Sequence, residues 1–207
     1  MVKKILLLVS FLFLLTSCKT PEELSVSAYE QIQHNLVNMT SYQAAANVKY
    51  ISNKGDNTYG VTQQCRTSGA YRVTVTSPEG VAGNVTVFDG KTISQFNPKV
   101  GDRVSVSTRE LSERSEIFVT SFVKNYISSK EVSVTAANME NSVCTVLEAS
   151  IPGENKYLAT EKLWVDNSSF KPVKMVIYDT AGSERIVVTF TSFEYNAEIG
   201  DEVFKVS

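Results

Sequence analysis

The first hydrophobic stretch of the chain is short and follows a basic start. Lys3 and Lys4 precede the run Ile5–Leu15, in which Ser10 is the one polar residue. A helix needs about 20 apolar residues to cross a bilayer, so this run is too short to span one. A basic start and an apolar core of this length are typical of a secretory signal peptide. We therefore expect residues 1–17 to be a leader that is removed on export.

The run ends in the tetrad Leu15-Thr16-Ser17-Cys18, which has the pattern of a bacterial lipoprotein signal. Leu15 is the bulky residue of that pattern, the next two residues are small, and Cys18 receives the lipid. The alternative is an ordinary secretory signal that a cysteine follows by chance. Stable anchoring takes more than one acyl chain, because each buried CH₂ contributes only about 0.8 kcal/mol. We expect acyl chains such as palmitate on Cys18 to hold the protein on the outer face of a bacterial membrane.

Apolar residues then recur at every fourth position, which predicts one amphipathic helix after the anchor. Thr20 and Glu23 fit a capping box, and Pro21 suits the first helical position. These signals predict a helix over Pro21–Asn38. Its apolar stripe consists of Leu24, Ala28, Ile32, Leu36 and Val37.

Polar and apolar residues alternate over much of the remaining chain, which predicts half-buried strands. Tyr71, Val73 and Val75 are one such series. Turn residues interrupt the alternation at short intervals, and Asp89-Gly90 between two such runs indicates a hairpin. Roughly ten or eleven strands result, mostly as an antiparallel meander. The other turn segments are Asn53–Asn57, Ser68-Gly69, Pro78–Gly80, Pro98–Gly101, Pro152–Asn155 and Asp179–Gly182.

A second helix is predicted within the strands, over Ser112–Ser128, where Gly and Pro are absent. Ser112 is its expected N-cap. Its apolar residues cover more than half of the circumference, which indicates deep burial. We expect this helix to fill the concave side of a curved sheet, with the bulky Phe118, Phe122 and Tyr126 as the plug. Its other apolar residues are Ile117, Val119, Val123 and Ile127.

Composition and charge favour one globular domain, residues 18–207. Hydrophobic residues make up 43% and charged residues 20% of the chain. Loss of Lys3 and Lys4 with the leader reduces the 20 basic residues to 18, against 22 acidic ones, a net charge near −4. The chain lacks the basic stripe of a nucleic-acid-binding protein.

Two cysteines remain once Cys18 carries the lipid. An exported location permits a disulfide between Cys65 and Cys144. Two buried free thiols are an equally good interpretation, because free cysteine behaves as a small hydrophobe.

The residues that catalysis commonly requires are scarce. The single histidine, His34, stands on the first predicted helix, so we expect no zinc site and no catalytic triad. Gly90-Lys91-Thr92 resembles the end of a P-loop, but the glycine that the motif needs five residues earlier is Val85. We expect no cofactor or metal. Trp164 is expected to be a packed strand residue, with a ligand-stacking role as the alternative.

Binding is therefore favoured over catalysis, and a cell-wall enzyme is the weakest of three hypotheses. A curved sheet with an apolar helix can hold an acyl chain in a cavity, or present a face or an edge to another protein. A homodimer through exchanged strands stays open.

The C-terminal third has a characteristic order of motifs. They are a strand that ends in Trp164-Val165-Asp166, a strand that begins at Pro172, the turn Asp179–Gly182, and a last strand leading to Asn196 and Phe204. This order resembles that of the LolA/LolB-like superfamily of lipoprotein carriers and their relatives. The resemblance implies a half-open antiparallel sheet of about eleven strands with helices on its concave side.

Within this superfamily the chain most resembles the GerS germination lipoproteins of spore-forming clostridia. That resemblance implies a non-enzymatic adaptor that binds and licenses a cortex-modifying N-acetylmuramoyl-L-alanine amidase. The alternative is a carrier that holds lipid or lipoprotein acyl chains in the half-barrel. A soluble carrier would lack its own anchor, and Cys18 argues against that form.

Overall fold

The computed structural model describes residues 26–107, 115–139 and 142–205. The expected signal peptide, Cys18 and the expected N-cap Ser112 lie outside these residues. The helices are α1 (Val26–Val37), α2 (Val119–Ser128) and the short 3₁₀-helix η1 (Asp201–Phe204). The strands are β1 (Ser41–Ser52), β2 (Gly55–Arg66), β3 (Tyr71–Ser77), β4 (Val85–Phe88), β5 (Thr92–Asn97), β6 (Asp102–Ser107), β7 (Val132–Met139), β8 (Ser142–Ser150), β9 (Thr160–Asp166), β10 (Pro172–Tyr178) and β11 (Glu184–Tyr195).

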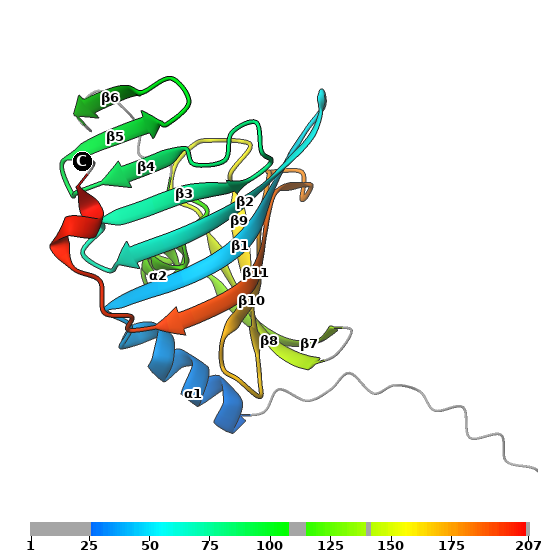
Figure 1. Ribbon diagram of the computed structural model, residues 1–207. Coiled ribbons are helices and arrows are strands. Elements are labelled where there is room, and N and C mark those ends of the chain that lie inside the picture. Colours follow the sequence, from blue (N-terminus) through cyan, green and yellow to red (C-terminus); the bar gives the residue numbers. More distant parts are fainter. Residues whose placement is uncertain (1–25, 108–114, 140–141, 206–207) are drawn as a thin grey trace, which may run out of the picture.

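All eleven strands form one antiparallel sheet, in the order β6-β5-β4-β3-β2-β1-β11-β10-β9-β8-β7 (Figure 1). The chain therefore makes two meanders, β1–β6 and β7–β11, which meet where the first strand pairs with the last. Strands β6 and β7 are the two ends of the sheet, so the sheet is open. The expected mainly-β fold with a half-open antiparallel sheet is confirmed.

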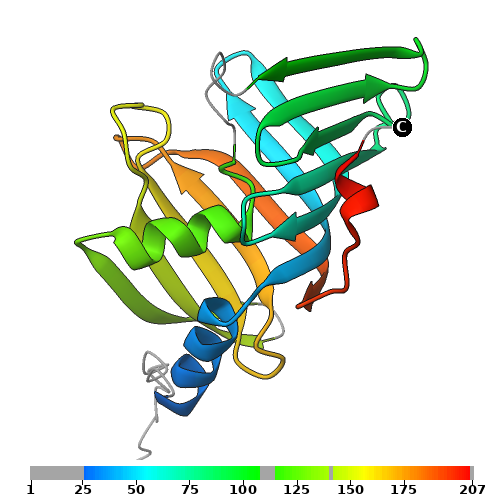
Figure 2. The same ribbon diagram turned by 90° about the vertical axis from the view of Figure 1, so that its left-hand side faces the viewer.

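The concave side of the sheet carries the main hydrophobic core. Side chains that alternate along each strand enter it, and Leu163, Met175 and Val188 have no exposed surface. α2 lies across the strands of the β7–β11 half on this side, and α1 lies beside it near the strand ends (Figure 2). Among the residues that the structure describes, no helix lies on the concave face of the β3–β6 part of the sheet.

The two halves are joined by the longest strands. β1 and β11 have 12 residues each, and they pair from Tyr42↔Tyr195 to Tyr50↔Ile186. The register shifts at Ala45/Ala46, which leaves Thr191 as an extra residue in β11. Because of this bulge, Phe190 and Phe193 both face the core despite their odd spacing, with ring centroids 5.6 Å apart.

The convex side of the β2–β4 region is covered by the segment that follows β11. Ile199 and Phe204 pack there on Ala70, Val85 and Val87. The Arg66 guanidinium lies 4.9 Å from the centroid of the Phe204 ring, and it donates to Asp201 Oδ1 at 2.6 Å and to the carbonyl of Ile199. Arg72 also donates to the carbonyl of Val203, at 3.2 Å, so two arginines hold this segment on the sheet.

One sequence expectation needs correction. The second helix begins at Val119, not at Ser112, because residues 115–118 form a turn whose last residue, Phe118, is extended.

Of the two interpretations left open for Cys65 and Cys144, the structure has the two buried free thiols and not the disulfide. They stand on β2 and β8, with four strands between them, and a disulfide requires Cα atoms about 4.4–6.8 Å apart.

Candidate functional site

The concave face is filled by α2 on one half only. Phe118 and Phe122 are 2% and 0% exposed, and both belong to the main core. The Phe118 ring packs on Tyr71 at 4.5 Å between centroids, and Tyr71 packs on Phe88 at 5.5 Å. Tyr126 is half-buried, and its hydroxyl lies 3.5 Å from that of Tyr29 on α1. The three aromatic residues expected to form the plug thus lie at different depths.

A ring of hydrogen bonds fixes the first turn of α2 to the sheet. The Tyr42 hydroxyl donates to Gln63 Oε1 at 2.8 Å and accepts from the Val119 N–H at 3.3 Å. Gln63 Nε2 donates to the carbonyl of Ile117 at 3.2 Å. This ring satisfies backbone groups at the helix start, where Phe118 offers no side-chain cap. Burial raises the pKa of the Tyr42 hydroxyl, which therefore stays protonated and able to donate.

The middle of α2 rests on a buried carboxyl group. Glu161 on β9 has no exposed surface, and its Oε1 accepts from Asn125 Nδ2 at 2.8 Å. In the part of the chain that the structure describes, Glu161 Oε2 is the one buried side-chain oxygen or nitrogen without a hydrogen-bond partner. Burial raises the pKa of Glu161 to about 7. These polar partners of α2 were not predicted from the sequence.

The uncovered half of the concave face contains an apolar groove of about 550 Å³. Its floor is formed by residues of strands β1 to β5, and its end is closed by Ile117 and Phe118. Tyr50 and Tyr59 meet edge to face at its rim, with ring centroids 6.1 Å apart. Tyr50 is 39% exposed. The groove has the size and lining of a small-ligand site. Its apolar floor residues are Val48, Val61, Tyr71, Val73, Val75 and Ile93.

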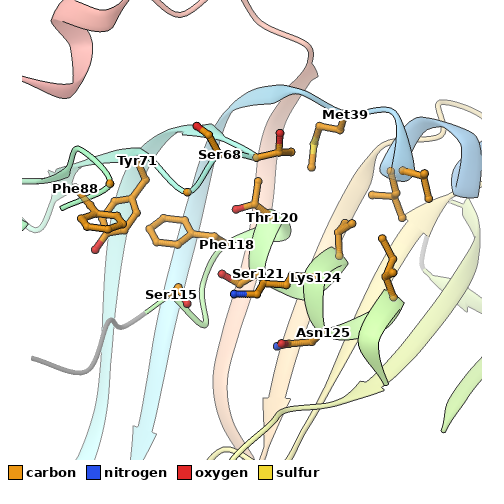
Figure 3. Close-up of a pocket in the computed structure, with 17 residues that line it drawn as sticks. Met39, Ser68, Tyr71, Phe88, Ser115, Phe118, Thr120, Ser121, Lys124 and Asn125 are labelled. Atoms are coloured by element: carbon orange, nitrogen blue, oxygen red, sulfur yellow. The ribbon is translucent and has the colours of Figure 1, made fainter. Parts of the chain in front are cut away.

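A second, more polar pocket of about 610 Å³ lies at the other side of Phe118 (Figure 3). It is bounded by Met39 after α1, by the β2–β3 turn at Ser68, and by Thr120, Ser121 and Lys124 of α2. Its apolar border continues into a smaller pocket of about 240 Å³ between α1 and α2. Val37 and Ile127 border both pockets and are 56% and 64% exposed.

The remaining candidate residues lie outside these cavities, except Gly90, which lines the pocket of about 610 Å³. His34 is exposed on α1, and Asp89-Gly90 forms the β4–β5 turn, where Asp89 Oδ1 accepts from the Lys91 and Thr92 N–H groups. Trp164 lies half-buried on β9, and the centroid of its ring is 5.1 Å from Lys174 Nζ. Within residues 26–107, 115–139 and 142–205, no cluster of three His, Cys, Asp or Glu side chains could hold a metal ion. No helix in those ranges is long and apolar enough to cross a membrane.

Fold and site together define a class: an open antiparallel sheet whose concave face is half filled by a helix of the same chain. The chain belongs to the sporulation protein YdcC-like family, whose model matches residues 2–204. A comparison with curated proteins gave no significant match.

Three solved structures are similar to this chain to different degrees. The GerS lipoprotein, solved in complex with the CwlD amidase from Clostridioides difficile, is 28% identical, with 86% of this chain and 99% of that chain covered and a TM-score of 0.50. An uncharacterised conserved protein from Thermus thermophilus is 12% identical over 87% and 92% of the two chains, with a TM-score of 0.54. A LolA superfamily protein from Nitrosomonas europaea is 16% identical over 87% and 96%, with a TM-score of 0.45. The expected resemblance to GerS is confirmed.

Proposed function

We propose that this protein is an exported, non-enzymatic lipoprotein adaptor that binds and licenses a cortex-modifying N-acetylmuramoyl-L-alanine amidase for spore germination. The observation that carries the proposal is the similarity to GerS, which spans 86% of this chain and 99% of that one. Membership of a sporulation family agrees with it. The lipidated Cys18 would hold the adaptor on the outer face of the membrane, close to the cell wall.

The state of the concave face also supports an adaptor. α2 occupies the β7–β11 half with buried aromatic side chains, and a hydrogen-bonded ring holds its first turn. A carrier of long acyl chains would need that volume for its cargo. Exposed apolar residues at the α1–α2 border, Val37 and Ile127, offer a partner surface of the kind that protein interfaces bury.

The test is affinity purification of the full chain, tagged at its C-terminus, from detergent extracts of sporulating cells. We expect a cell-wall amidase to co-purify, and we expect deletion of the adaptor to abolish amidase cleavage of cortex peptidoglycan. A deletion strain with normal cleavage would overturn the proposal. Metabolic labelling with palmitate, compared between the wild type and Cys18→Ala, tests the anchor separately.

The second candidate function is a carrier of lipid or lipoprotein acyl chains. The open apolar groove of about 550 Å³ favours it. Native mass spectrometry of the protein extracted in mild detergent would show bound lipid if this function holds. An empty protein that still binds the amidase would leave the adaptor as the function.

A further inference from the structure

The feature that the proposed function leaves unexplained is the carboxyl group of Glu161 beneath α2. It is fully buried, and one of its oxygens lacks a hydrogen-bond partner among the described residues. Its one hydrogen bond comes from Asn125, in the middle of α2. Burial of an acid with a single neutral partner costs much less free energy when the acid is protonated than when it is charged.

Among the described residues, the groups that act on Glu161 include no cation. Its neighbours in the sheet are Ala149 on β8 and Ile177 on β10, both apolar. The charged group that acts on it is Glu116, in the turn before α2, and it has the same sign. The nearest charged residue along β9 is Lys162, whose Nζ lies 3.1 Å from Glu148 Oε2. Because successive strand residues point to opposite faces of the sheet, this ion pair is on the convex side.

We propose that Glu161 is a proton-controlled latch for α2. The neutral carboxyl group keeps the helix on the sheet, and loss of its proton weakens that docking and gives access to the β7–β11 half of the concave face. The opened surface would be continuous with the groove on the β1–β5 half, because Ile117 and Phe118 close the end of that groove. The latch is a property of this chain alone and does not depend on the proposed amidase partner.

The direction of the pH effect follows from burial. The pKa of Glu161 is about 7 when α2 is docked and returns toward the ordinary value of 4.5 when water reaches the group. Docking is therefore strongest below pH 4.5, weakens as the pH rises toward 7, and changes little above that. The equilibrium constant for docking changes by up to about tenfold per pH unit in this window, which gives a total on the order of a hundredfold.

The test is hydrogen–deuterium exchange of the full chain between pH 5 and pH 8, corrected for the intrinsic rate of amide exchange. We expect the protection of the α2 amides after Phe122 to fall by at least tenfold toward pH 8, while the protection of β1 and β11 stays constant. Glu161→Gln keeps a neutral acceptor for Asn125, so α2 should stay protected at pH 8. Glu194→Gln, at an exposed position on β11, is the matched control and should behave as the wild type does.

Binding of the uncharged dye Nile red gives a second readout that does not require the variant to fold. In the wild type, we expect more dye to bind at pH 8 than at pH 5 as the concave face opens. Equal protection of α2 at both pH values, or a loss of protection shared by the whole sheet, would overturn the latch. So would a Glu161→Gln variant that folds and keeps the pH profile of the wild type.

Discussion

At the scale of single residues, two polar side chains in core positions carry the docking of α2. Gln63 stands in the alternating series Tyr59, Val61, Gln63 and Cys65, and Glu161 precedes Leu163 and Val165 in a similar series. In both cases, the sequence signal for a role in docking is a polar residue at an inward-facing position of a strand. The partners could not be predicted, because Ile117 and Asn125 lie 54 and 36 residues away in the sequence.

The hydroxyl of Tyr42 links both sides of the hydrogen-bonded ring, so its removal should be costly. Tyr42→Phe leaves Gln63 Oε1 and the Val119 N–H without a buried partner. We expect the free energy of unfolding to fall by about 1–3 kcal/mol. Urea denaturation followed by circular dichroism measures this change. Tyr157→Phe, at a 52% exposed ring, should leave stability within about 0.5 kcal/mol of the wild type.

The two buried thiols should be inert in the native protein. Burial raises the pKa of Cys65 to about 12, and the pKa of Cys144 is raised as well, again mainly by burial. We expect iodoacetamide at pH 8 to leave both unmodified in the folded chain. In denaturant without a reductant, both should react, as peptide mass spectrometry would show. Protection that persists in denaturant until a reductant is added would mean that the disulfide exists after all.

At the scale of elements, the period-two pattern predicted most strands well, and the Asp89-Gly90 hairpin lies where it was expected. At β11 the strict alternation breaks, because the bulge at Thr191 shifts the inward face by one residue. The prediction from apolar periodicity was wrong at the start of α2. The apolar periodicity there continues through Ile117 and Phe118, but the ring from Tyr42 and Gln63 holds these residues in a turn.

Asp166 organises the turn between β9 and β10, and this makes the turn sensitive to acid. Burial opposes ionisation of its carboxyl group, but hydrogen bonds from Ser168 and Ser169 outweigh that effect and lower the pKa to about 2. The contribution to stability is therefore present above pH 3.8 and is lost as the pH falls toward 2.

We expect the free energy of unfolding of Asp166→Asn to be about 1–2 kcal/mol lower than that of the wild type at pH 7. The difference between the two proteins should become smaller below pH 4. Urea titrations at several pH values measure it. Asp102→Asn, at an exposed position of β6, should keep the acid sensitivity of the wild type. A gap that stays constant down to pH 2 would contradict the assigned role of the charge.

At the scale of the whole molecule, one curved sheet presents two concave halves of different character. The β7–β11 half is filled by α2, whereas the β1–β5 half is an open apolar groove. The resemblance to LolA-like proteins predicted the open sheet and the helix on its concave side. It did not predict how far one helix of ten residues reaches across eleven strands. That extent depends on the length of α2 and on the aromatic contacts at Phe118.

A pair of variants on β3 tests whether function uses the open groove. Val75→Glu places a charge on the groove floor, whereas Thr76→Glu places one on the opposite face of the same strand. If the protein is a carrier, we expect Val75→Glu to reduce bound lipid at least tenfold and Thr76→Glu to have little effect. If it is an adaptor that binds elsewhere, both variants should retain the co-purified amidase. Circular dichroism establishes that both variants are folded.

The pairing of β1 with β11 also determines when the sheet can be completed during folding. Tyr42 and Tyr195 are neighbours in the sheet although nearly the whole domain separates them in the sequence. A chain that emerges N-terminus first can build the β1–β6 meander early, but β1 keeps one bare edge until the final strand arrives. Contacts of such long range slow folding. During that wait, the bare edge can recruit a strand from another newly made chain.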